Sequence, residues 1–327
     1  MSWLATSRRS LGVALLGGVL ATALAASAQP EPEAGPTRPF LGGDLDQDTI
    51  LDRLENGAPF RFRQVGTSSI TLRIDLGAGH DAAYKPRTHS HPRGYLAEIA
   101  AYRVARALAM DNVPPVVGRP LNRVAVQNRF ESEHEEDWEP LRREILWDAP
   151  GVARGAMIYW IPRMRASELD EVSGLAAVGE WLRVGGELPE DREALARDLS
   201  TMLAFDYLVG NWDRFSGGNV STDDGGRRLF VRDHNVAFQS PLTETLYARV
   251  RGHLERTERF SRGFVDALRA LDEARLRAAL AEDPEAEARS ILSDGQVEGI
   301  LMRRRALLSY IGALVALHGA ERVLVWP

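Results

Sequence analysis

The chain contains no cysteine, and this absence removes several classes of protein chemistry. Disulfide bonds, thiolate zinc sites, a cysteine nucleophile and a lipid-modified cysteine are all excluded. Any metal site must therefore use oxygen atoms or imidazole. The seven histidines are scattered, and His89 and His91 have no third ligand near them in the sequence, so the pattern does not favour zinc.

Lysine is almost as scarce as cysteine. Among the 40 lysines and arginines, Lys85 is the sole lysine, which leaves 39 arginines. A compact ammonium reaches between phosphate groups in a way that a planar guanidinium does not. The sequence therefore predicts a role for Lys85 that requires an amine. The alternative is a lysine that remains by chance in an arginine-rich composition.

The chain also lacks an excess of positive charge. Its net charge of -6 and its pI of about 5.7 provide no general basic field, so nucleic acid and anionic membranes are disfavoured as partners. The 327 residues, 44% hydrophobic and 26% charged, are typical of a folded protein with one large core or two lobes. No Walker loop, nucleophile elbow or zincin helix is present.

Residues 1–28 have the pattern of an export signal. Arg8 and Arg9 precede an apolar run, which ends at an A-x-A cleavage site. The run is short and rich in alanine and glycine, so we expect no membrane span in the mature chain. Residues 29–58 begin with a proline-rich stretch and are predicted to be a flexible tether. We expect the mature protein to be periplasmic or extracellular.

After this tether the pattern becomes that of strands. Residues 60–65 and 70–76 alternate apolar and polar side chains across a turn, and a third short strand ends on Lys85. The turn contains Ser68 and Ser69, whose amides and hydroxyls are candidate contacts for a phosphate. The alternative is a turn with no ligand.

A helix is predicted at residues 95–110, with Glu98 in an apolar setting on both faces. A carboxylate in such a place needs a cation, and Lys85 is the obvious candidate. Kinases use a strand lysine paired with a helix glutamate to aim the lysine at nucleotide phosphates. The alternative is a Glu98 side chain that reaches water.

The remaining elements are predicted more coarsely. Residues 119–126 are predicted to form a strand, the acidic run 131–137 a solvated loop, and residues 155–161 a buried strand suited to a hinge. The rest is predicted to be mostly helical. A capping box of Ser293 and Gln296 opens a long helix near the C-terminus.

Residues 205–238 concentrate the polar chemistry of the chain. A helical pattern ends at Gly210, a loop contains Asp213 and Asn219, and a short apolar run delivers Asp233. Phosphoryl transfer needs one carboxylate to orient the attacking hydroxyl, and a second carboxylate with an amide oxygen to hold a divalent cation. Asp213, Asp233 and Asn219 can fill these roles. The alternative is a polar loop stabilised by Asx turns.

In this order, the strand lysine, helix glutamate, hinge strand, N-x-D-R loop and strand aspartate resemble the secretory-pathway kinases of the Golgi casein kinase and four-jointed type. The similarity covers the chain from about residue 60 to its C-terminus. It is carried by the strings YKPRTHSHPRGYLAEIAAYRVARAL, NVPPVVGRPLN, GAMIYWIPRM, FDYLVGNWDR and LFVRDHNVAF. More distantly, the N-x-D-R loop is similar to those of phosphatidylinositol kinases and HipA toxin kinases.

The resemblance implies an α+β fold of the two-lobed, atypical protein-kinase-like type. A small β-rich N-lobe with one main helix would occupy residues 59–160, and a larger, mostly helical C-lobe residues 161–327. The resemblance also implies ATP and Mn²⁺ or Mg²⁺ as cofactors, and a secreted protein or glycan as the acceptor.

The resemblance further implies roles for individual residues. Lys85 would hold the phosphates, and Glu98 would orient Lys85 and contact the metal. Asp213 would act as the catalytic base, and Asp233 would ligate the metal. A nucleotide-binding pseudokinase that acts as a scaffold is the alternative function, and a small-molecule or sugar phosphotransferase is a third. Retention of Lys85, Glu98, Asp213 and Asp233 together argues against a pure scaffold, which does not need the base.

Two departures from the family pattern bear on these roles. The chain has D-R-F at 213–215 where family members usually have D-R-H, and D-H-N at 233–235 where many have D-N-G. Asn219 lies six residues after Asp213, one more than the usual kinase interval. Asn211 is therefore an alternative ligand for the metal.

Overall fold

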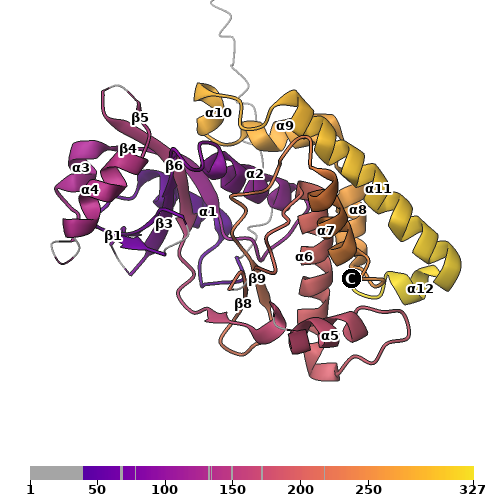
Figure 1. The fold of residues 1–327 in the computed structure, drawn as a ribbon. Coiled ribbons are helices and arrows are strands. Elements are labelled where there is room, and N and C mark those ends of the chain that lie inside the picture. Colours follow the sequence, from indigo (N-terminus) through magenta and orange to yellow (C-terminus); the bar gives the residue numbers. More distant parts are fainter. Residues whose placement is uncertain are drawn as a thin grey trace, which may run out of the picture. The chain divides into compact units, whose positions relative to one another are not determined.

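The computed structural model describes residues 40–66, 69–77, 79–131, 133, 135–148, 150–170, 172–216 and 218–327. The predicted export signal and Ser68 lie outside these ranges. Figure 1 shows a sheet-rich part that is followed along the chain by a mostly helical part. This division agrees with the predicted small β-rich lobe and larger helical lobe.

The smaller lobe is built on an antiparallel sheet with the strand order β1-β2-β3-β6-β4, in which β5 also pairs with β6. Lys85 lies opposite Ala156 in the register between β3 and β6. The predicted early strands and the predicted strand near residue 155 are thus confirmed. The strands are β1 Arg61–Val65, β2 Thr71–Asp75, β3 Asp81–Pro86, β4 Val116–Asn122, β5 Trp147–Asp148 and β6 Val152–Tyr159.

Helix α2 (Gly94–Ala107) packs between this sheet and the helical lobe. Every residue from Gly94 to Ala105 is buried, because α2 contacts β4 and β6 on one side and the helical lobe on another. The small side chains of Ala97, Ala100 and Ala101 allow these neighbours to approach closely. The predicted helix is confirmed, and it brings Glu98 into the interior.

The prediction of a flexible tether up to residue 58 is wrong for its described part. Helix α1 (Gln47–Asn56) is capped by Asp46, whose side chain accepts a hydrogen bond from Thr49 N. Phe40, Ile50 and Leu54 are buried in the core of the smaller lobe. The proline-rich composition applies only to the stretch before residue 40, and the amphipathic spacing that follows it specifies a helix.

Two further local predictions need correction. The predicted strand at 119–126 is β4 followed by α3 (Arg123–Gln127), because Asn122 accepts hydrogen bonds from the backbone amides of Val124 and Ala125 and starts a helix. The predicted acidic loop at 131–137 leads directly into α4 (Glu135–Glu144), whose residues Trp138 and Leu141 are buried. In both places a local cap or an apolar face outweighs the composition.

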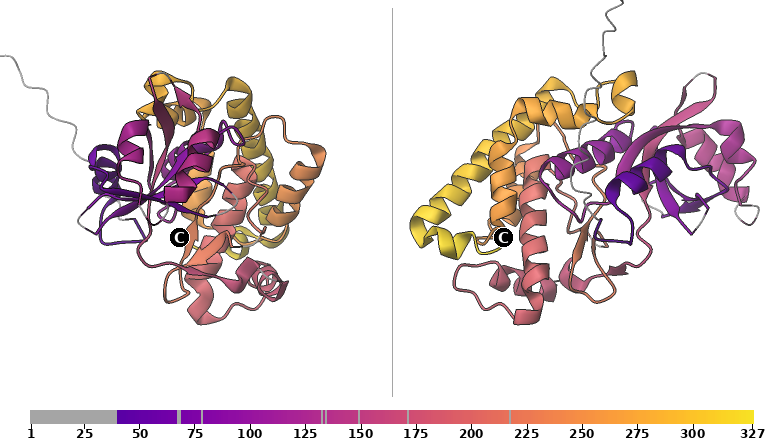
Figure 2. Two further views of the ribbon diagram at one scale, coloured as in Figure 1. Left: turned by 60° about the vertical axis from the view of Figure 1, so that its left-hand side comes forward. Right: turned by 180° about the vertical axis from the view of Figure 1, so that it is seen from behind.

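The helical lobe is arranged around α6, which packs against α11, and α11 also contacts α8 and α9 (Figures 1 and 2). The predicted capping box of Ser293 and Gln296 is confirmed at the start of α11. None of the helices in the described ranges has the length and apolar character that a membrane span requires. The helices are α5 Val172–Trp181, α6 Glu193–Val209, α7 Glu244–Leu254, α8 Arg262–Ala270, α9 Glu273–Ala281, α10 Glu285–Ala288, α11 Asp294–His318 and α12 Ala320–Val323.

A second, small sheet with the order β7-β8-β9 completes the helical lobe. Its strands are β7 Arg165–Ala166, β8 Val220–Thr222 and β9 Leu229–Val231. The three residues of β9 are fully buried. This burial fixes the position of the polar segment that follows β9.

Buried acids of the helical lobe anchor it to the smaller lobe. Asp283 accepts hydrogen bonds from Arg103 Nη2 at 2.9 Å and from Gly118 N at 3.1 Å. Glu285 accepts a hydrogen bond from Tyr95 Oη at 3.0 Å. Because these groups are buried on both sides, separating the lobes here would expose unpaired charges.

We predict that Gly118→Ala destabilises the protein. A Cβ atom at Gly118 would lie 2.5 Å from Glu285 Cβ and 2.7 Å from Asp283 Oδ1. Such overpacking costs about 1–3 kcal/mol in the free energy of unfolding, which chemical denaturation measures. Gly312→Ala is the control, because a Cβ atom there meets nothing within 4 Å and alanine favours the helix. Equal effects of the two substitutions would contradict the anchoring role.

Candidate active site

Lys85, Glu98 and Asp233 form an ion cluster between the lobes, in which Glu98 is buried and the other two are partly buried. Lys85 Nζ lies 2.5 Å from Glu98 Oε1 and 2.8 Å from Asp233 Oδ1. The lysine comes from β3, the glutamate from α2, and the aspartate follows β9. The predicted pair of Lys85 and Glu98 is confirmed, and the contact of Lys85 with Asp233 adds a second carboxylate to it.

The cluster keeps Lys85 and Glu98 in their charged forms. Burial would raise the pKa of Glu98, but the Lys85 ammonium and the His234 contacts outweigh burial and hold that pKa well below its usual range. Burial would likewise lower the pKa of Lys85, but Glu98 and Asp233 raise it above its ordinary value. Lys85 is therefore an ammonium at neutral pH.

His234 is a member of this site that the sequence analysis did not identify. Its backbone N donates to Glu98 Oε1 at 3.1 Å, and its Nδ1 lies 3.6 Å from Glu98 Oε2. Its Nε2 lies 3.3 Å from Arg214 Nη2. Because a guanidinium only donates, Nε2 accepts this bond and Nδ1 carries the proton that faces Glu98. The departure from D-N-G was the one sequence signal for this role.

A buried ion pair of Asp206 and Arg214 stabilises the segments next to the cluster. Arg214 donates from Nε to Asp206 Oδ2 at 2.8 Å and from Nη2 to Asp206 Oδ1 at 2.9 Å. Its Nη1 donates to the carbonyl oxygens of Asn219 and Arg232. One guanidinium thus joins the end of α6, the polar loop and the end of β9. The sequence analysis did not predict this pair.

Asn211 connects the same elements and retains an unused oxygen. Its Nδ2 donates to Asp206 Oδ1 at 3.3 Å and to the carbonyl oxygen of Asp233 at 3.1 Å. Its Oδ1 is buried and has no hydrogen-bond partner among the described residues.

Asp233 has a φ of 61°, a left-handed conformation that is unusual for a residue with a side chain. The bonds from Lys85 and Asn211 hold it there.

Asp213 and Asn219 lie together in the polar loop. Asn219 Nδ2 donates to the carbonyl oxygen of Asp213 at 3.1 Å and to Ser216 Oγ at 3.3 Å. Asp213 is partly buried and does not line the cleft that contains the ion cluster. The structure therefore brings Lys85, Glu98 and Asp233 into direct contact and leaves Asp213 at a separate position on the loop.

The cleft has a volume of about 470 Å³ and is lined by two kinds of residue. The polar ones include Ser69 and the ion cluster; the apolar and aromatic ones include Ala83, Pro114, Ile158, Met164, Tyr159 and Trp160. No group of three or more acidic or histidine side chains that could hold a metal by themselves occurs in the described ranges. The cleft can thus hold a ligand with an apolar ring and an anionic end.

Comparison with solved structures identifies the fold. The chain superimposes on the crystal structure of the Golgi casein kinase with Mn/ADP bound with a TM-score of 0.65 and 17% identity, over 85% of this chain and 78% of that chain. It matches hydra Fam20 with sugar with a TM-score of 0.65 and 16% identity, over 88% of this chain and 94% of that chain. The predicted two-lobed, atypical kinase-like α+β fold is confirmed.

Sequence comparisons do not add a relative. No protein-family model matches the chain, and no curated protein matches it. The resemblance to the secretory-pathway kinases is thus confirmed for the fold, by the solved structures.

We predict that Asp206→Asn lowers the free energy of unfolding by about 3–5 kcal/mol, because it leaves the Arg214 cation buried without a counter-charge. Urea denaturation measures this change. Asp266→Asn is the matched control, since Asp266 pairs with Arg269 on an exposed surface at 2.7 Å. Exposed pairs contribute little, so the control should unfold like the parent. A small effect of Asp206→Asn would show that the loop does not depend on the pair.

Proposed function

We propose that this chain is an ATP- and metal-dependent kinase that transfers the γ-phosphate to a hydroxyl of a protein or glycan. The ammonium of Lys85, held by both Glu98 and Asp233 at the wall of the cleft, is the observation that carries this proposal. It combines a phosphate-binding cation with a carboxylate that is available to a metal. The kinase-like fold supports the same function.

The nucleotide would lie in the cleft between the lobes, whose boundary we place after residue 160. The apolar wall around Ile158 and Tyr159 suits the base, and the end with Lys85 suits the phosphates. Glu98 orients Lys85, because its Oε1 accepts bonds from both Lys85 Nζ and His234 N. Ser69 lines the cleft. Of the two serines in the predicted phosphate-binding turn, it is the one that the structure describes.

The residues present fit a divalent cation that is shared with phosphates. Mg²⁺ is commonly held by one or two carboxylates together with substrate phosphates, without a complete protein cage. Asp233 supplies a carboxylate, and Asn219 also lines the cleft. The buried Oδ1 of Asn211 is a further unused oxygen. The Golgi casein kinase was crystallised with Mn/ADP. A bound metal would neutralise phosphate charge; a metal contact by Glu98 remains a prediction.

Asp213 is the proposed catalytic base. Its carboxylate accepts the proton of the acceptor hydroxyl, and the hydroxyl oxygen forms a bond to the γ-phosphorus as the bond to the β-γ bridging oxygen breaks. The ADP formed keeps the electron pair of the broken bond. The bond from Asn219 to the Asp213 carbonyl oxygen steadies the loop during this step. Lys85 stabilises the negative charge on the phosphates.

A nucleotide-binding pseudokinase is the second candidate function, and two observations favour it. Lys85 already occupies Asp233 Oδ1, and Asp213 does not line the cleft. In an active kinase, nucleotide and metal must compete with Lys85 for Asp233. The acceptor must also bind close enough to Asp213 for its hydroxyl to contact that carboxylate. The predicted export signal would place the acceptor of the active kinase in the periplasm or outside the cell, and either a glycan or a protein can supply the hydroxyl.

We predict that Asp213→Asn binds ATP and metal like the parent but transfers phosphate at least about a hundredfold more slowly, since a general base contributes roughly 10²- to 10⁴-fold. Calorimetry measures binding, and transfer of labelled phosphate to acidic proteins and glycans measures activity. Asp224→Asn, in the exposed turn between β8 and β9, is the control and should keep full activity. Full transfer by Asp213→Asn would place the base elsewhere; a parent that binds nucleotide but transfers nothing supports the pseudokinase.

We predict that Lys85→Arg folds normally but loses most of its activity. The substitution keeps the charge, but a planar guanidinium cannot reproduce a single ammonium that bonds Glu98 and Asp233 while facing phosphates. Melting temperature and turnover of the two proteins test this claim. Turnover close to that of the parent would mean that the sole lysine of the chain has no special role.

A further inference from the structure

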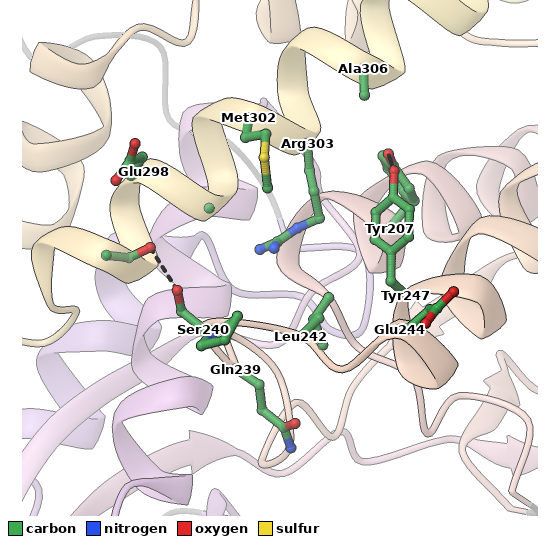
Figure 3. A pocket seen from close by; sticks show the side chains of 13 residues that line it. Tyr207, Gln239, Ser240, Leu242, Glu244, Tyr247, Glu298, Met302, Arg303 and Ala306 are labelled. Carbon is green, nitrogen blue, oxygen red and sulfur yellow. Dashed lines mark hydrogen bonds between the residues drawn. The ribbon is translucent and has the colours of Figure 1, made fainter.

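A second cavity of about 520 Å³ lies within the helical lobe, and none of its lining residues belongs to the nucleotide cleft. Figure 3 shows it between α11, the end of α6, the start of α7 and the segment from Gln239 to Leu242. Residues of α11 form one side, and Tyr207 and Tyr247 form another. The cavity is thus built from three helices and one loop segment.

The side chain of Arg303 reaches into this cavity from α11 (Figure 3). The residue is only 4% exposed. Its Nε donates to the carbonyl oxygen of Leu208 at 2.8 Å, which caps the C-terminus of α6. Over the described ranges of the chain, no carboxylate lies within 4.0 Å of this guanidinium, and its two Nη atoms donate to no protein acceptor.

Capping of α6 does not account for the whole guanidinium, because it uses one nitrogen of three. Arg103 and Arg214 are comparably buried, and each is paired with an aspartate. Burial lowers the pKa of Arg303 to about 10, so the group is still a cation at neutral pH. A buried cation with free donors that face a cavity is expected to attract an anion.

The walls of the cavity restrict the kind of anion. Leu242 and Met302 supply apolar surface, and Met302 is 53% exposed. Glu244 and Glu298 also line the cavity, and they would repel a multiply charged group such as a phosphate more strongly than a single negative charge. A single negative charge on an apolar body satisfies both conditions. The volume suits a small organic molecule.

We propose that this cavity binds a monoanionic carboxylate carried on an apolar body, with the carboxylate on Arg303 and the body against Leu242 and Met302. Such a group can come from a free small carboxylic acid or from the C-terminus of an apolar peptide. This binding site is independent of the proposed kinase activity, because it shares no residue with the nucleotide cleft.

Calorimetry with the full chain tests the proposal. The probes are 4-phenylbutyrate and its neutral amide, an acetylated leucyl-phenylalanine dipeptide and its C-terminal amide, and inorganic phosphate. We expect at least one acid to bind about tenfold or more tightly than its amide, because the amide loses a charged hydrogen bond. Binding of phenylbutyrate indicates a free acid as the source, and binding of the dipeptide acid alone indicates a peptide C-terminus.

Two substitutions locate the binding. Met302→Glu adds a negative charge at the exposed mouth, beside Glu244 and Glu298, and should weaken binding of the acid about tenfold or more, whereas the matched Met302→Gln should change it little. Arg303→Gln should abolish the preference for acid over amide. If Arg303→Gln fails to fold, the Met302 pair still decides the location.

Several results would overturn the proposal. They are equal affinities of acid and amide, tighter binding of phosphate than of either acid, no binding of any acid up to about 10 mM, or equal affinities of the Met302→Glu and Met302→Gln proteins for the acid.

Discussion

The candidate site depends on the ion pair and the hydrogen bonds that the guanidinium of Arg214 makes. This guanidinium is buried, it pairs with Asp206 through two nitrogens, and it donates to the carbonyl oxygens of Asn219 in the polar loop and of Arg232 after β9. A buried carboxylate and guanidinium satisfy each other only in one planar geometry. The end of α6, the loop with Asp213 and the end of β9 therefore have fixed positions relative to one another, and Asp233 follows directly from the last of these.

Helix α2 connects these segments to the smaller lobe. Glu98 on α2 accepts bonds from Lys85 of the sheet and from the backbone of His234 in the helical lobe. Farther along the same helix, Arg103 pairs with Asp283. The bond from the His234 backbone to Glu98 and the ion pair of Arg103 with Asp283 join the two lobes, so a change in the lobe arrangement must either preserve these contacts or replace their partners. In the proposed kinase, nucleotide phosphates would replace Asp233 as a partner of Lys85, and a metal would replace Lys85 as the partner of Asp233.

Arginine has a structural use in this chain that explains part of its abundance. Arg103 and Arg214 link separate elements through buried aspartates, and Arg303 caps α6 through a backbone carbonyl oxygen. A planar cation with several donors can satisfy two or three carbonyl or carboxylate groups at once. Lys85, in contrast, has a place where a compact ammonium bonds two carboxylates beside an open cleft.

The sequence by itself determined the alternating strands, the helix with Glu98, the pairing of Glu98 with Lys85 and the capping box at Ser293, because each depends on spacing or on a local charge requirement. It also indicated the kinase-like fold through motif order. Only the tertiary structure decided that His234 contacts Glu98, that Asp206 pairs with Arg214, and that residues 40–58 fold onto the small lobe. The packing of the helices and strands brings these residues together. Neither periodicity nor composition in the sequence indicates which buried charged groups will be in contact.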